Sequence, residues 1–155
     1  MTVERSGLVI RAGEGKDISL AQHRQRTIRV KAGEQETAGA YQLFESTVPA
    51  GGRGAPPHLH RRAEEGFYVL EGALNLRLGE EEIEATAGTF VLVPRGLAHS
   101  FDNHGAVPAR YLVIWSPAEA GRYFAELAEL ERSQGREPDA ETVAALRRRY
   151  EFVYL

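Results

Sequence analysis

The sequence contains no cysteine among its 155 residues. This absence excludes disulfides, zinc ribbons, thiolate catalysis and iron–sulfur ligation. The good metal ligands that remain are histidine imidazoles and carboxylates. Any metal site in this chain must therefore be built from nitrogen and oxygen ligands.

Long apolar segments and a dominant charge are also missing. No stretch approaches the roughly 20 apolar residues of a membrane-spanning helix, and the first residues, MTVERSGLVIRAGEGKD, lack the apolar region of a secretion signal. The net charge of −3 arises from 19 basic and 22 acidic residues that are interleaved along the chain. We therefore expect a soluble, cytoplasmic protein with no membrane or nucleic-acid partner.

Glycine and proline divide the chain up to Trp115 into short pieces that are rich in Val, Leu, Phe and Tyr. This pattern is typical of an all-β domain, and the length and the 43% hydrophobic content suit one domain with its own core. The pattern predicts nine strands, at Leu8–Ile10, Thr27–Lys31, Ala40–Val48, Glu65–Leu70, Leu74–Leu78, Glu82–Ala85, Thr89–Val93, His99–Asn103 and Arg110–Trp115.

The strand predicted at Thr89–Val93 is apolar on both faces, because Phe90 and Leu92 oppose Val91 and Val93. Such a strand is expected where a second sheet covers it. The sequence therefore favours a closed, two-sheet architecture, either a barrel or a sandwich.

After Trp115 the spacing of apolar residues becomes helical. Ser116 is the expected N-cap of a first helix, with Pro117 at its first position and Glu119 completing a capping box. A second helix is expected over Asp139–Tyr150. We expect both helices to pack on one end of the barrel through Ala120, Tyr123, Phe124, Leu127, Leu130, Val143, Leu146 and Tyr150.

His58 and His60 are two residues apart, so in an extended strand both imidazoles lie on one face. Glu65 opens the next strand in phase with Phe67, and a buried carboxylate without a partner would cost several kcal/mol. His99 follows a Pro-Gly corner and adds a third imidazole. Together these residues offer three nitrogens and one carboxylate to a metal.

Each of these residues also has an ordinary interpretation. An HxH pair on a polar loop is usually surface decoration, and a lone histidine such as His99 is more often a satisfied core residue. Glu64 and Glu65 could form a solvated turn, while His23 and His104 lie in polar stretches and are assigned to the surface. The aromatic residues expected in the core, or around a cavity within it, are Phe67, Phe90, Phe101, Tyr111 and Trp115.

The combined spacings resemble the two sequence motifs of the cupin superfamily. GRGAPPHLHRRAEEGFYVLEG, Gly52 to Gly72, resembles the first motif, and counting back from its final glycine selects Glu65 rather than Glu64. GTFVLVPRGLAHSFDN, Gly88 to Asn103, resembles the second motif at every fixed position. The flanking stretches AGAYQLFESTVPAGG and PARYLVIWSPAEAGRYFAEL resemble small cupins similar to quercetin dioxygenases.

The resemblance implies a single cupin β-barrel, a double-stranded β-helix or jelly roll, over residues 1–116, with a motif core at 52–103. Residues 117–155 would form a C-terminal helical extension of the same domain. The resemblance also implies one divalent transition metal ion, Fe, Mn, Ni, Co, Cu or Zn, and a homodimer. The implied metal ligands are His58, His60, Glu65 and His99.

Three functions remain open on these residues. The resemblance favours a metal-dependent dioxygenase that cleaves an enolic or aromatic small molecule, with Glu65 as the catalytic base. The same site without dioxygen would suit an isomerase, epimerase or lyase acting on a hydroxy-carbonyl metabolite. A third possibility is a non-enzymatic cupin in which the metal only holds a small-molecule ligand.

Overall fold

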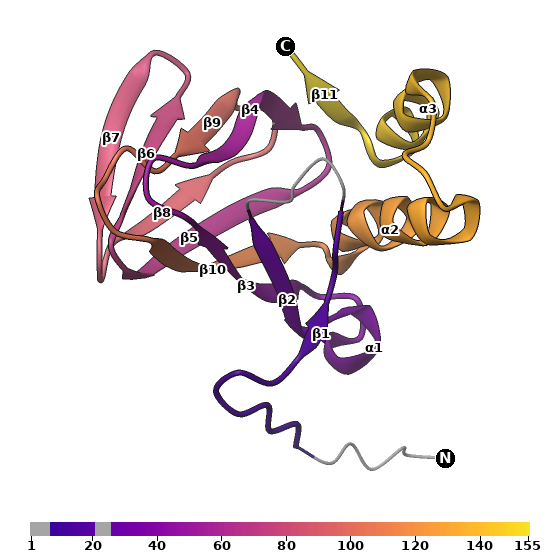
Figure 1. The fold of residues 1–155 in the computed structure, drawn as a ribbon, viewed down its shortest axis with the longest axis horizontal. Helices are drawn as coiled ribbons and strands as arrows, with labels where there is room; N and C mark the ends of the chain where they lie inside the picture. The colour runs from indigo at the N-terminus through magenta and orange to yellow at the C-terminus, as the bar shows by residue number, and fades with distance from the viewer. Residues whose placement is uncertain (1–6, 21–25) are drawn as a thin grey trace.

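The computed structural model describes residues 7–20 and 26–155. Two antiparallel sheets form a β-sandwich, and two helices lie beside one end of it (Figure 1). The first sheet has the strand order β1 (Lys16–Asp17), β2 (Thr27–Ala32), β3 (Gln42–Val48), β10 (Ala109–Ser116), β5 (Glu64–Glu71) and β8 (Phe90–Val93). The second has the order β11 (Phe152–Tyr154), β4 (Arg53–His60), β9 (His99–Asp102), β6 (Ala73–Leu78) and β7 (Glu81–Thr86). This architecture confirms the all-β, two-sheet cupin fold expected from the sequence.

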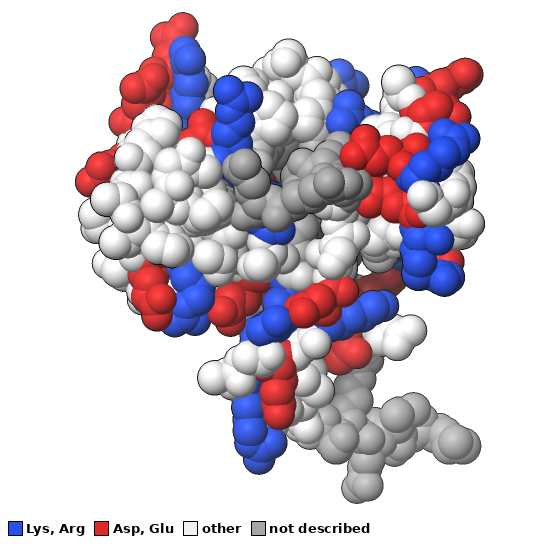
Figure 2. Space-filling model, viewed as in Figure 1, with Lys and Arg blue, Asp and Glu red and all other residues white. Residues whose placement is uncertain are grey.

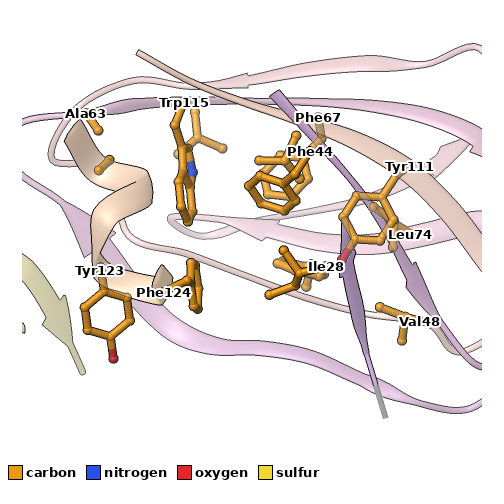
Figure 3. Packing of buried hydrophobic residues seen from close by; sticks show 14 of the residues in the cluster. Ile28, Phe44, Val48, Ala63, Phe67, Leu74, Tyr111, Trp115, Tyr123 and Phe124 are labelled. Carbon is orange, nitrogen blue, oxygen red and sulfur yellow. The ribbon is translucent and has the colours of Figure 1, made fainter. Parts of the chain in front are cut away.

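The core lies between the sheets and follows from alternation along the strands. In β10, Tyr111, Val113 and Trp115 are buried while Ile114, between two of them, is 39% exposed. Leu74 of the opposite sheet faces this row, as Figure 3 illustrates. Each such large apolar side chain contributes about 1.5–3 kcal/mol through its removal from water.

The chain after β10 forms a short 3-10 helix, η2 (Ala118–Gly121), and then helices α2 (Arg122–Gln134) and α3 (Ala140–Tyr150). Glu151 ends α3 in the left-handed conformation, and the chain returns as β11, which pairs with β4. The pairing sets Phe152 opposite His60 and Tyr154 opposite His58. The C-terminal helices therefore deliver a strand to the sheet that carries both histidines. A further short helix, α1 (Glu34–Thr37), lies between β2 and β3.

The expected N-terminal strand at Leu8–Ile10 is wrong. This segment has no regular secondary structure and pairs with no strand among the described residues, and Val9 is 73% exposed. The first strand is instead the two-residue β1, where Lys16 and Asp17 pair with Val30 and Arg29. Three apolar residues in a row were not enough to bury the segment, because Gly13 and Gly15, both with positive φ, turn the chain between it and the sheet.

The expectation that Thr89–Val93 is covered on both faces is also wrong. Val91 and Val93 point into the core, but Phe90 and Leu92 are 56% and 54% exposed. Each sheet of the sandwich meets the other with one face only, so the outer face of β8 is exposed, as are Tyr68 of β5 and Ile114 of β10. Phe90 is thus the one aromatic residue expected in the core that lies outside it.

The expected capping of the first helix at Ser116 is wrong as well. Ser116 is the last residue of β10, and its hydroxyl donates to the carbonyl of Ala40 at 3.0 Å. Pro117 precedes η2, and no side-chain hydrogen bond caps either η2 or α2. The second helix begins as expected, because the Asp139 carboxylate accepts the Thr142 N–H at 2.8 Å.

In Figure 2, charges of both signs lie mainly around the border of the face and below it, next to a broad uncharged area. Bidentate pairs such as Arg29 with Asp17 and Arg122 with Glu34 account for part of this pattern. Among the described residues, no helix combines the length and apolar character needed to cross a membrane.

Candidate metal centre

The four residues that the sequence singled out come from three strands and both sheets. His58 and His60 lie on β4, where residues on one face are buried and those between them are not. His99 opens β9 and is the direct cross-strand partner of His58. Glu65 comes from β5 of the opposite sheet, and all four side chains belong to residues at most 5% exposed.

The ligand atoms of these residues converge on one point. One atom from each of the four side chains can be chosen so that all lie within 4.8 Å of one another. Glu65 Oε2 lies 3.1 Å from His60 Nε2 and 2.9 Å from His99 Nε2. The ring centroids of His58 and His99 are 4.2 Å apart.

Backbone carbonyls orient two of the imidazoles. His58 Nδ1–H donates to Pro56 O at 2.7 Å, and His99 Nδ1–H donates to Leu97 O at 3.0 Å. Because Nδ1 is used in this hydrogen bond, the Nε2 atom of each ring is the nitrogen that can bind a metal. Metal-binding histidines usually adopt this arrangement. His60 Nδ1, by contrast, is buried with no hydrogen-bond partner among the described residues.

Burial and proximity shift the pKa values of the cluster. Burial, assisted by His99, lowers the pKa of His58 to about 4, so its imidazole is neutral at neutral pH. Burial opposes ionisation of Glu65, but hydrogen bonds from His60 and His99 outweigh it and hold the pKa of this carboxyl well below its usual range. Burial likewise opposes the charged form of His99, yet the Glu65 carboxylate raises its pKa.

The donor set fits a transition-metal ion. Bonds of about 2.0–2.2 Å from one ion to nitrogen and oxygen place its ligand atoms up to about 4 Å apart, close to the spread of the cluster. Neutral imidazoles together with a carboxylate suit Fe, Mn, Ni, Co, Cu or Zn. Four protein ligands leave two positions of a six-coordinate ion open for exchange.

An aromatic cavity lies beside the metal centre, and His58, His60 and Glu65 form part of its wall. The Phe152 ring lies 4.3 Å from that of His60, and the Tyr154 ring stacks on His58 at 5.4 Å. Water centres can occupy about 20 Å³ of this cavity, room for about one molecule. The remaining wall residues are Arg26, Phe44, Ala55, Phe101, Val113, Trp115 and Phe124.

Two features of this cavity were missed from the sequence. Strand β11 closes it with Phe152 and Tyr154, and the alternation in FVY was a signal too short to separate from the end of the helix before it. Arg26 was not singled out, because a lone arginine in a polar stretch carries no sequence signal of its own.

Three polar residues near the motifs or elsewhere in the chain were not expected to bind the metal: Glu64, His104 and His23. Glu64 lies at the rim, with Arg95 Nε 3.7 Å from its carboxylate. The side chain of His104 is 71% exposed, as expected for a surface residue. His23 lies outside the described residues.

Comparison with known proteins agrees with this fold. The model of the Cupin_2 family, described as "Cupin domain", matches residues 44–115. A quercetin 2,3-dioxygenase from Bacillus subtilis is 30% identical over 146 residues, which cover 83% of this chain and 42% of the relative. The chain spans about half the length of several curated relatives.

Solved structures carry the same architecture. A predicted oxalate decarboxylase from Thermotoga maritima matches with a TM-score of 0.64 and 18% identity, over 71% of this chain and 99% of the other. A polyketide cyclase from Streptomyces resistomycificus matches with a TM-score of 0.53 and 27% identity, over 75% and 78%. With both sequence motifs, the matching family model and this fold, the chain belongs to the cupin superfamily.

Proposed function

We propose that the chain is a metal-dependent dioxygenase that cleaves an enolic or aromatic small molecule. The observation that carries the proposal is the buried set of His58, His60, Glu65 and His99, whose ligand atoms all lie within 4.8 Å of one another. The 30% identity to a quercetin 2,3-dioxygenase across 83% of this chain supports the choice of reaction.

A metal held by His58, His60, Glu65 and His99 would supply Lewis-acid and redox chemistry to the substrate oxygen. The residues of the chain would provide the rest. His58 and His99, oriented by Pro56 and Leu97, would hold the ion. Glu65 is the proposed base, and its carboxylate would accept the proton of an enol or phenol hydroxyl.

The aromatic walls would exclude water from the reacting atoms. Trp115 stacks on Phe124 at 5.3 Å, and Phe152 closes the side next to His60. An apolar wall of this kind suits a flat, unsaturated substrate and strengthens electrostatic interactions at the metal.

A second candidate is a lyase, isomerase or cyclase that uses the same residues without dioxygen. The similarity to a polyketide cyclase at 27% identity supports this second candidate. In that reaction Glu65 would move a proton on a hydroxy-carbonyl substrate and return it to another atom.

An oxygen electrode separates these candidates. Protein loaded with each of the six candidate metals would be mixed with quercetin and, separately, with an enolic and a phenolic carboxylate. Oxygen uptake and product formation would be followed with and without air. Oxygen uptake that needs metal and is lost in His99→Ala supports the dioxygenase. Turnover that persists without oxygen supports the second candidate, and binding of these compounds with no turnover of any of them would contradict both.

We also propose that the chain forms a homodimer. An exposed apolar patch supports this, made of Tyr68, Phe90, Leu92 and Ile114 on the outer face of three adjacent strands. Tyr68 pairs with Phe90 across the sheet, and the backbone edge of β8 is open beside them. A second copy could cover this patch and extend the sheet.

A further inference from the structure

Arg26 lies at the junction of two spaces. It lines the metal cavity with His58, His60 and Glu65. It also lines a surface groove of about 910 Å³ between the N-terminal strands and α2, together with Ile18, Leu20, Ile28 and Ala128. The Arg26 side chain therefore belongs to the walls of both spaces.

Two hydrogen-bond donors in the cavity lack acceptors. Arg26 Nε and Trp115 Nε1 are both buried with no hydrogen-bond partner among the described residues. Both groups donate only, so neither can satisfy the other. Leaving such groups unpaired is costly, and an acceptor-rich ligand would satisfy them.

Aromatic rings hold the guanidinium in place. The Arg26 Cζ atom lies 5.6 Å from the ring centroid of Phe101 and 5.8 Å from that of Phe124. Contacts of this kind position the side chain without neutralising its charge. The guanidinium is thus held between two rings, next to the Tyr111 hydroxyl, and no residue that the structure describes neutralises its charge.

Several of the neighbouring charges are already matched. Arg29, in the groove, is paired with Asp17, and Arg132 at its rim is paired with Glu129. The cavity carboxylate, Glu65, is bound by His60 and His99. Arg26 forms no ion pair with any residue that the structure describes.

We infer that Arg26 binds a carboxylate of the substrate, so the substrate class is a carboxylate-bearing enolic or aromatic molecule. The planar guanidinium matches a carboxylate in a charge-assisted hydrogen bond, and the Trp115 N–H lies in the same cavity as a second donor. The assignment of the substrate body to the metal rests on the proposed function. The assignment of the anion to Arg26 rests on the cavity, which has room for about one water molecule, so only the carboxylate group of such a ligand would enter it.

Equilibrium binding of matched probes tests this inference without turnover. Benzoate, its neutral analogue benzamide and phenyl phosphate would be titrated into zinc-loaded protein without oxygen. Emission of Trp115, the only tryptophan in the chain, reports on the cavity, and calorimetry gives an independent affinity. We expect benzoate to bind at least tenfold more tightly than benzamide or phenyl phosphate.

Arg26→Gln is the test variant and Arg29→Gln its matched control. Arg26→Gln should weaken benzoate about tenfold or more, with benzamide affinity and zinc content unchanged. Arg29→Gln should bind both probes as the wild type does, because its charge is already paired with Asp17. Arg26→Lys, which keeps the charge without the planar fork, should fall between the wild type and Arg26→Gln.

Several results would overturn the inference. These are no benzoate binding to the wild type, equal benzoate affinity in the wild type and Arg26→Gln, or tighter binding of phenyl phosphate. Benzoate affinity that disappears on EDTA treatment but survives in Arg26→Gln would assign the carboxylate to the metal instead. If no metal-dependent oxygen uptake is observed but the affinity for benzoate still depends on Arg26, the proposed reaction is wrong and the assigned class of ligand is retained.

Discussion

Glu65 and His99 are 34 residues apart in the sequence, and Glu65 Oε2 lies 2.9 Å from His99 Nε2. The two residues come from different sheets, β5 and β9. The contact therefore exists only when the two sheets pack face to face. The candidate metal centre is thus part of the core, and its geometry depends on the closure of the sandwich.

Replacement of His99 by alanine should reduce metal affinity at least tenfold, because loss of an outer-shell partner alone commonly costs about 10–100-fold. His104→Ala is the matched control, since the His104 side chain is 71% exposed. Metal content after dialysis, measured by mass spectrometry, checks the prediction. Equal loss from both variants would contradict the assignment of His99 as a ligand.

Gly72→Ala should destabilise the protein more than Gly88→Ala. Both glycines have positive φ, 70° and 89°, so each substitution costs about 1–3 kcal/mol of backbone strain. A Cβ at Gly72 would also overlap the Pro108 carbonyl, whereas nothing lies within 4 Å of one at Gly88. Urea unfolding measures the difference, and equal losses would show that the close approach at Gly72 is easily relieved.

Much of the metal centre could be predicted from the sequence, because the residue spacings that define it lie within single strands and short motifs. The two-residue spacing of His58 and His60 sets both on one face of β4, and the phase of Glu65 with Phe67 points it into the core. The motif spacing then identifies His99 as the residue that joins them. None of these steps requires knowledge of a distant contact.

The features that could not be predicted depend on non-local packing. Phe90 and Leu92 have the apolar pattern of a covered strand, but only the inner face of β8 meets the other sheet, and its outer face is exposed. Strand β11 is three residues long, and only its pairing with β4 makes it a strand. Neither fact is encoded within the segment itself.

Asp139→Ala should lower the melting temperature, because the Asp139 carboxylate caps α3 through the Thr142 N–H at 2.8 Å. That hydrogen bond lowers the pKa of Asp139 below its ordinary value of 3.8. The cap therefore stabilises above that value and is lost as the pH falls through the lowered pKa. The difference in melting temperature between wild type and variant should narrow from about pH 5 to about pH 2.

The control is Asp139→Asn, which keeps an acceptor but has no charge to titrate. This variant should retain most of the stability at neutral pH. A difference between wild type and Asp139→Ala that does not change with pH would contradict the role of the ionised cap.

Phe152→Ala should cost about 3–5 kcal/mol of unfolding free energy, as is typical for a buried phenylalanine. Phe152 is 4% exposed and contacts the rings of His60 and Tyr123. Because it also packs near Trp115, the tryptophan emission should shift to longer wavelength. Leu155→Ala is the control, since Leu155 is 71% exposed and should change stability by less than about 0.5 kcal/mol.

Leu92→Glu should convert the proposed homodimer to a monomer. Leu92 is 54% exposed in the patch that also contains Tyr68, Phe90 and Ile114, and a carboxylate there would be desolvated in the interface. Light scattering after gel filtration should give twice the chain mass for the wild type and one chain mass for the variant. Val107→Glu is the control, because Val107 is 58% exposed in the loop before β10. A monomeric wild type, or a Leu92→Glu variant that is still a dimer, would show that this patch does not form a dimer interface. Neither result would affect the predictions for Arg26 and the metal site, because those residues face the interior of the sandwich.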